Sequence, residues 1–176
     1  MKLLRLRTGL FATVAFSLVL LYLIWWSAYT YVHYESRYTP QPPGAAAEVL
    51  GTSVRLLSLT QTDQLTEIEG DQPPKVPDPG AVWIVAELEA VRHDEAEKFL
   101  CLTEVVGPDG LRWEPASVYV DRSMPRCDSS ELAVDRPYRF EALYMVPRRY
   151  ADQLAGIALP DNSTADRTPV IRPPAG

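Results

Sequence analysis

The chain has 176 residues, with 17 basic and 23 acidic side chains and a net charge of −6 at pH 7. Without Lys2, Arg5 and Arg7 the charge is −9, which argues against nucleic-acid binding and against electrostatic docking on anionic lipid. The simplest meaning of this charge is solubility. Basic residues are mostly arginine and Asn162 is the only asparagine. This bias is typical of GC-rich genomes and favours a bacterial source, such as an actinobacterium.

The first feature along the chain is an apolar segment behind a basic flank. No charged residue occurs from Thr8 to Tyr34, and about 20 apolar residues suffice to cross a bilayer as a helix. The sequence therefore predicts a basic cytoplasmic flank over residues 1–8 and a transmembrane signal anchor over residues 9–34. The positive-inside bias predicts a cytoplasmic N-terminus and an extracytoplasmic C-terminal domain. The predicted location is the plasma membrane, and the lipid bilayer is the first predicted partner.

Two alternatives concern this segment. A cleaved signal peptide would have a shorter apolar core and small residues before the cut, and Trp26, two places before Ala28, spoils such a site. Small residues at four-residue spacing let two membrane helices approach closely. Gly9, Thr13 and Ser17 have this spacing. They form a possible helix-packing face, although small residues also align by chance.

Proline marks two further boundaries. Residues 35–47 contain Pro40, Pro42 and Pro43, which exclude a helix and indicate a semi-rigid stalk. Residues 161–176 are polar and proline-rich, which indicates a disordered tail. The remaining residues, 48–160, are predicted to form one extracytoplasmic domain.

This domain has a strand-like pattern. Residues 81–92 alternate between two faces. Every second residue from Val82 to Ala90 lies on one face, and every second residue from Trp83 to Val91 lies on the other, which is typical of a half-buried strand. Further strands are predicted over 54–59, 98–106, 111–114, 118–120, 137–146 and 157–159, with a loop over 70–80, a turn over 107–110 and one or two helical turns over 148–154. Many short strands and almost no helix in this region predict an all-β fold, an antiparallel β-sandwich preceded by one transmembrane helix.

Three local motifs resemble a known family. Gly80 precedes the long alternating strand, and Asp109-Gly110 lies at the hairpin turn with Trp113 three residues later. The run Tyr138-Arg139-Phe140 leads to Tyr144-Met145-Val146-Pro147. These motifs resemble the telokin-like, immunoglobulin-like extracytoplasmic domains that follow a single anchor in many actinobacterial proteins. The resemblance implies an immunoglobulin-like sandwich that acts as a binding or structural module, in a family of mostly unknown function.

The two cysteines are the clearest candidate pair. Exported domains can hold disulfides and an even count fits that role, so we expect a Cys101–Cys127 bond. In the alternatives, Cys101 is buried and Cys127 exposed without a bond, or the two form a redox-active pair.

No catalytic set is apparent. His93 is the only candidate base in the domain, and Asp94, Glu95 and Glu97 follow it. This cluster could hold a divalent cation, but a solvated acidic turn fits it better because the glycine and spacing of a calcium loop are missing. Trp83 shares a strand face with Glu87 and Glu89, which indicates partial exposure and a possible interaction surface. We expect no enzyme activity, no metal and no cofactor.

These patterns predict a single-pass membrane protein whose exported domain works by binding a protein partner or another component of the cell envelope. The alternative is a small accessory subunit that contacts a membrane complex through its transmembrane helix.

Overall fold

The computed structural model describes residues 2–35, 38–67, 73–94, 99–118, 120–160 and 167–175, and within the N-terminal helix it describes the side chains of residues 14–30. The chain divides into two compact units, Met1–Arg37 and Tyr38–Gly176.

The first unit is one helix, α1 (Lys2–Glu35). Its large apolar side chains from Val14 to Tyr29 are 43–65% exposed, because no other element of their own unit covers them. An aromatic cluster within this stretch has ring centroids 5.6–6.4 Å apart; it consists of Tyr22, Trp25, Trp26 and Tyr29. The side chains described in α1 run only from Val14 to Thr30. Among the residues described, no helix is both long and apolar enough to span a membrane.

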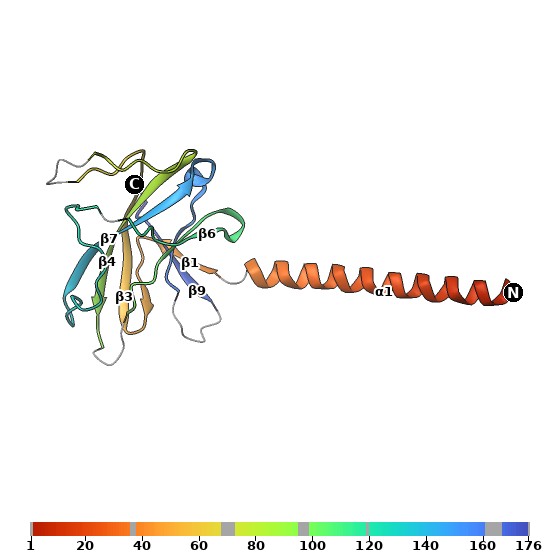
Figure 1. The fold of residues 1–176 in the computed structure, drawn as a ribbon. Helices are drawn as coiled ribbons and strands as arrows, with labels where there is room; N and C mark the ends of the chain where they lie inside the picture. Colours follow the sequence, from red (N-terminus) through yellow and green to blue (C-terminus); the bar gives the residue numbers. More distant parts are fainter. Residues whose placement is uncertain are drawn as a thin grey trace. The chain divides into compact units, whose positions relative to one another are not determined.

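The second unit consists of two β-sheets (Figure 1). The four-stranded sheet has the order β2-β3-β4-β7. Its strands are β2 (Ala47–Val49), β3 (Thr52–Thr62), β4 (Ala81–Arg92) and β7 (Pro137–Pro147). The five-stranded sheet has the order β1-β9-β8-β5-β6. Its strands are β1 (Tyr38–Pro43), β9 (Thr168–Arg172), β8 (Gly156–Ala158), β5 (Glu104–Val106) and β6 (Arg112–Trp113). Two short 3₁₀ helices, η1 (Pro108–Gly110) and η2 (Arg148–Gln153), complete the elements described. The predicted two-sheet β fold is confirmed.

The main core lies between the sheets. Every second residue of β4 from Val82 to Ala90 is at most 2% exposed, as the alternation predicts. These side chains share one apolar cluster with Ile157 of β8 and Ile171 of β9. Strand β4 therefore lines one side of the core, and the shorter strands of the five-stranded sheet line the other side.

The predicted stalk (35–47) and the predicted disordered tail (161–176) are both wrong where the structure describes them. Strand β1 pairs in parallel with β9, with Pro40 opposite Val170, and Arg172 Nε donates to the Gln41 carbonyl at 2.8 Å. Prolines exclude a helix, but an edge strand tolerates them because one row of N–H groups needs no partner. Ile171 is fully buried, so the sandwich extends from β1 to β9 rather than from 48 to 160. Residues 161–166 and 176 lie outside the described residues.

Two strand predictions differ from the structure. The strand predicted over 98–106 is observed only as β5, because Cys101 has a φ of 58°, which breaks an extended strand. Residues 118 and 120 belong to no strand, and Tyr119 lies outside the described residues. The predicted hairpin is confirmed, since Val105 pairs with Trp113 across the turn.

Candidate functional site

A long connection, residues 114–136, runs from β6 to β7 and accompanies the outer edge of β7. The Ala116 N–H donates to the Leu143 carbonyl at 2.7 Å, and the Glu141 N–H donates to the Pro125 carbonyl at 2.8 Å. Arg122 Nε forms an ion pair with Glu141, which is 6% exposed. These bonds satisfy an edge that would otherwise present unpaired backbone groups.

The same connection buries the outer face of the sheet at one end. Val120 packs there with Leu65, Trp83, Val85 and Leu143 in a second apolar cluster. The prediction that Trp83 is partly exposed and forms an interaction surface is wrong, since its exposure is 1%. Alternation separates the two faces of a strand correctly, but it cannot show that a distant loop covers the second face.

Farther along the outer face, Glu89 lies between two arginines. Its carboxylate contacts Arg55 Nη2 at 2.7 Å and Arg139 Nε at 3.0 Å. The hydrogen bond from Arg139 and the charge of Arg55 outweigh desolvation and hold the pKa of Glu89 below its usual value. At 8% exposure Glu89 is buried rather than turned to solvent. The two arginines are the cross-strand neighbours of Glu89 on β3 and β7, and they compensate its charge.

The predicted disulfide is confirmed: Cys101 and Cys127 are bonded, with their Cα atoms 5.8 Å apart. Cys101 lies just before β5 and Cys127 lies in the 114–136 connection. The bond therefore ties this connection to the segment that enters the five-stranded sheet. Neither cysteine is fully buried.

An open groove of about 650 Å³ lies beside the disulfide, and we call it the disulfide groove. It combines apolar, aromatic and charged side chains. Its lining residues are Leu100, Cys101, Pro125, Arg126, Cys127, Asp128, Ser129, Glu131 and Tyr138. Leu100 is 47% exposed. A concave surface with an exposed apolar side chain and a few polar groups is a common form of binding site.

Tyr138 and Asp128 are held in place within the disulfide groove. The Tyr138 hydroxyl donates to the Arg126 carbonyl at 3.0 Å. Burial, with the nearby Glu131 and Asp128 carboxylates, raises the pKa of Tyr138. Asp128 Oδ1 accepts bonds from the Ser130 N–H at 2.8 Å and from its hydroxyl at 2.7 Å. These bonds preorganise a wall of the groove.

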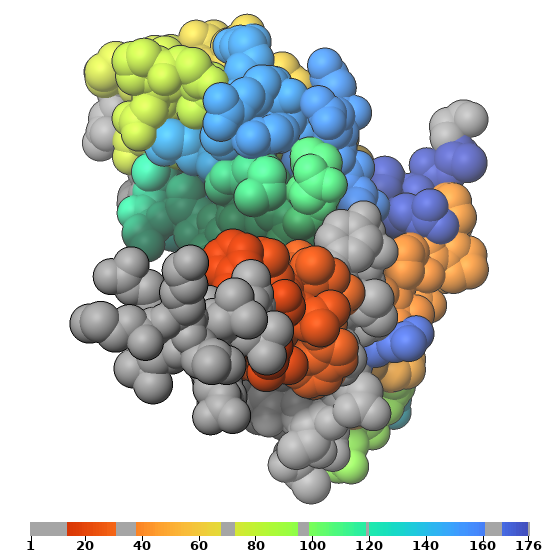
Figure 2. Space-filling model, turned by 90° about the vertical axis from the view of Figure 1, so that its right-hand side faces the viewer, coloured from red at the N-terminus to blue at the C-terminus, as the bar shows by residue number. Residues whose placement is uncertain are grey.

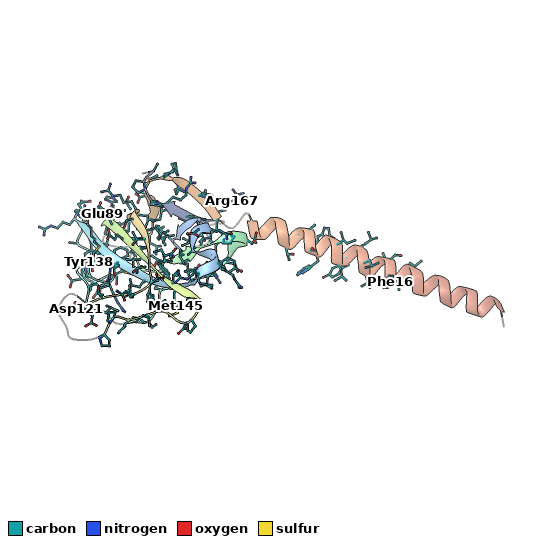
Figure 3. The ribbon with its side chains drawn as sticks, turned by 90° about the horizontal axis from the view of Figure 1, so that it is seen from above. Phe16, Glu89, Asp121, Tyr138, Met145 and Arg167 are labelled. Atoms are coloured by element: carbon teal, nitrogen blue, oxygen red, sulfur yellow. A yellow bond between two sulfur atoms is a disulfide. The ribbon has the colours of Figure 1, made fainter. Side chains whose placement is uncertain are left out.

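This groove lies at one end of the β4–β7 ladder. Tyr138 pairs with Ala90, whereas Met145 pairs with Trp83 near the other end. Figure 3 labels Glu89 and Tyr138 close together and Met145 apart from them. The disulfide groove and the buried Trp83 cluster thus lie toward opposite ends of the β4–β7 ladder.

His93 Nδ1 lies 3.1 Å from Asp135 Oδ1, and both side chains are half or more exposed. Glu95 and Glu97 lie outside the described residues. Within the described part of the chain, no group of three histidine, cysteine or acidic side chains is placed to hold a metal ion.

The predicted packing face of Gly9, Thr13 and Ser17 lies in the continuous helix α1. The side chains at positions 9 and 13 are outside those described. The helical backbone does place the three positions along one side of the helix, since they are four residues apart.

Sequence patterns did not identify Leu100 and Arg126 as lining residues of this groove. One signal was present: Leu100 and Leu102 flank Cys101, and apolar residues on both sides of a disulfide in a poorly alternating segment indicate a surface loop. Both leucines are more than 40% exposed.

No family model matches this chain, and no curated protein matches it. Two solved structures are similar. One is a conserved hypothetical protein from Bacillus anthracis, with 13% identity, a TM-score of 0.46 and coverage of 65% of this chain and 84% of that chain. The other is an uncharacterized beta-sandwich protein from Clostridium difficile, with 8% identity, a TM-score of 0.47 and coverage of 77% of this chain and 94% of that chain.

Proposed function

We propose that this protein is a single-pass membrane protein of the cell envelope whose extracytoplasmic, immunoglobulin-like sandwich binds a partner. The observation that carries the proposal is the division into two units of opposite character. One is a helix with exposed apolar side chains, and the other is an acidic sandwich with its own core and a disulfide.

The anchor is supported by helix and sequence together. α1 is continuous over the whole charge-free run from Thr8 to Tyr34, and its aromatic cluster lies in the half that follows the apolar core. Aromatic rings of this kind prefer the headgroup level of a bilayer. The orientation with Lys2, Arg5 and Arg7 in the cytoplasm follows from the positive-inside bias. The disulfide fits the opposite, oxidising side.

Protease protection tests the anchor and its orientation. In intact spheroplasts of the producing bacterium, external protease should digest the sandwich and leave a membrane-protected fragment of about 4 kDa, the size of the predicted flank and anchor together. Extraction of the full chain by alkaline carbonate without detergent would contradict the anchor. Digestion of the sandwich only after lysis would contradict the orientation.

The disulfide groove is the proposed binding surface. Its support is the combination of the exposed Leu100, the fixed ring of Tyr138 and the preorganised Asp128 turn in one concavity. Recognition by such a surface needs a few well-placed contacts and no reacting group. The proposed role is therefore binding rather than catalysis.

A charge substitution tests this surface. Leu100→Asp should weaken recovery of crosslinked partners at least tenfold, since it places a charge where an apolar contact forms. Leu111→Asp is the matched control because Leu111 is similarly exposed, at 41%, but lies outside the groove lining. Equal recovery with both variants would exclude the groove as the binding surface.

The second candidate is an accessory subunit whose transmembrane helix makes the essential contacts. The alignment of Gly9, Thr13 and Ser17 along α1 favours it. Replacement of Leu10–Trp26 by an unrelated membrane helix separates the two proposals. Partners retained after the exchange support the sandwich, and partners lost support the helix.

A further inference from the structure

A proline-rich segment, residues 73–80, forms an arm before β4. Four of its residues are prolines: Pro73, Pro74, Pro77 and Pro79. In Figure 1 this yellow-green arm leaves the body of the sandwich at the end where β4 begins, and Figure 2 shows it at the surface. Val76, in its middle, is 70% exposed, more than any other large apolar side chain described.

The core fixes the arm next to Val76. Lys75 exchanges two backbone hydrogen bonds with Leu65, at 2.9 and 3.0 Å. The Lys75 carbonyl also accepts a bond from Trp83 Nε1 at 3.0 Å. Leu65 and Trp83 are each 1% exposed, so this point of the arm is tied to buried side chains.

The other end of the arm is fixed as well. The Ala81 N–H donates to the Asp78 carbonyl, and the Arg148 N–H donates to the Gly80 carbonyl, both at 2.9 Å. The proline rings lock their own φ near −65°, and Pro77 favours extended backbone at Val76, which precedes it. Asp78 lies at a bend that leads into the turn at residues 79–80. Little conformational entropy remains to be lost on binding.

The backbone chemistry restricts the kind of partner. Four of the seven residues from Pro73 to Pro79 lack an N–H group, so a partner cannot pair along the arm as an added strand. Fixed extended proline segments bind instead in aromatic-lined grooves, which hold the rings by stacking and need few hydrogen bonds. Pro74 and Pro77 have the Pro-x-x-Pro spacing of such ligands.

We infer that the 73–80 arm is a preformed ligand for a partner protein with an aromatic-lined groove, and that Val76 inserts its side chain beside the proline rings. The surface is independent of the disulfide groove, because it lies at the opposite end of the β4–β7 ladder. The role of Trp83 in recognition is indirect: its indole holds the arm in place without touching the partner.

Site-specific photocrosslinking tests the inference. The full chain carries p-benzoylphenylalanine at position 76, or at the exposed position Asp152 as a control, and is irradiated in the producing cells. The adduct at position 76 should map, by mass spectrometry of the crosslinked peptide, to aromatic residues of another protein. The double variant Pro74→Ala/Pro77→Ala should reduce this adduct roughly fourfold or more, because it frees the arm. Pro137→Ala, an exposed proline elsewhere, should leave it unchanged.

Folding is checked by the thermal midpoint of each variant, and Val76→Asp provides a second probe because an exposed side chain can change without unfolding the domain. This variant should lose the partner in the pull-down while keeping its midpoint. The inference is wrong if position 76 gives no more adduct than position 152. It is also wrong if the adduct lies on lipid, on a second copy of this chain or on a surface without aromatic side chains.

Discussion

Removal of the disulfide tests the central tie of the sandwich. The bond joins residues 26 apart. In the chain-entropy model, a loop of this length restricts the unfolded chain by about 3.5 kcal/mol at 25 °C. Unfolding the roughly 140 residues of the second unit changes entropy by about 2.1 cal/mol/K per residue. The variant Cys101→Ser/Cys127→Ser should therefore melt about 12 °C lower, as measured by circular dichroism or calorimetry.

Two controls accompany this measurement. Dithiothreitol should lower the midpoint of the unmodified chain by a similar amount, and it should leave the double serine variant unchanged. A fall of less than about 3 °C would refute the reasoning, because the unfolded chain would then gain little freedom from losing the bond. A fall with dithiothreitol in the serine variant would show that the reagent acts elsewhere.

Three further predictions concern stability. Trp83→Phe removes the bond to the Lys75 carbonyl and should cost about 1–2 kcal/mol in urea unfolding; a neutral result would mean that the indole does not hold the arm. The lowered pKa of Glu89 means that its stabilisation is complete above about pH 4.3, its unfolded value, and is lost as pH falls through the folded pKa. The stability gap between the unmodified chain and Glu89→Gln should thus be constant at pH 6–8 and shrink in acid, whereas a pH-independent gap would refute the ion pairs. Ile171→Ala should lower the free energy of unfolding by about 2–5 kcal/mol, whereas Pro174→Ala, at an exposed position, should lower it by less than about 0.5 kcal/mol. Equal effects would show that β9 does not contribute to the core.

The sequence predicted the elements whose information is local. Strand β4 has the predicted bounds and buries the predicted face, because alternation over this length favours a strand with one apolar face, although residues 82–86 are buried on both faces. The turn with Asp109-Gly110 was predictable because Asp109 and Gly110 have the positive φ angles that Asp and Gly tolerate. The hairpin at Leu50-Gly51 was not, since Leu50 has a φ of 48° and leucine gives no such signal.

The chain ends were mispredicted because their strands are stabilised by each other. Strand β1 contains three prolines, and β9 offers only Val170 and Ile171 to the core. Neither would be stable alone. Their parallel pairing joins residues about 130 positions apart, as in Tyr38 opposite Thr168, and no local pattern contains this information. The proline-rich composition of these ends does exclude a helix, but it does not exclude an edge strand.

The surfaces were harder to predict than the core for a related reason. Alternation in β4 separates Ile84 from Trp83, yet both are buried, because the 114–136 connection covers the second face. This cover depends on the Cys101–Cys127 bond and on the ion pair at Glu141. The same connection that buries Trp83 also forms a wall of the disulfide groove. The placement of the 114–136 connection thus decides which face of the sheet is buried and which surface is available to a partner. Because the Cys101–Cys127 bond holds this connection in place, the proposed binding at the disulfide groove depends on that bond most.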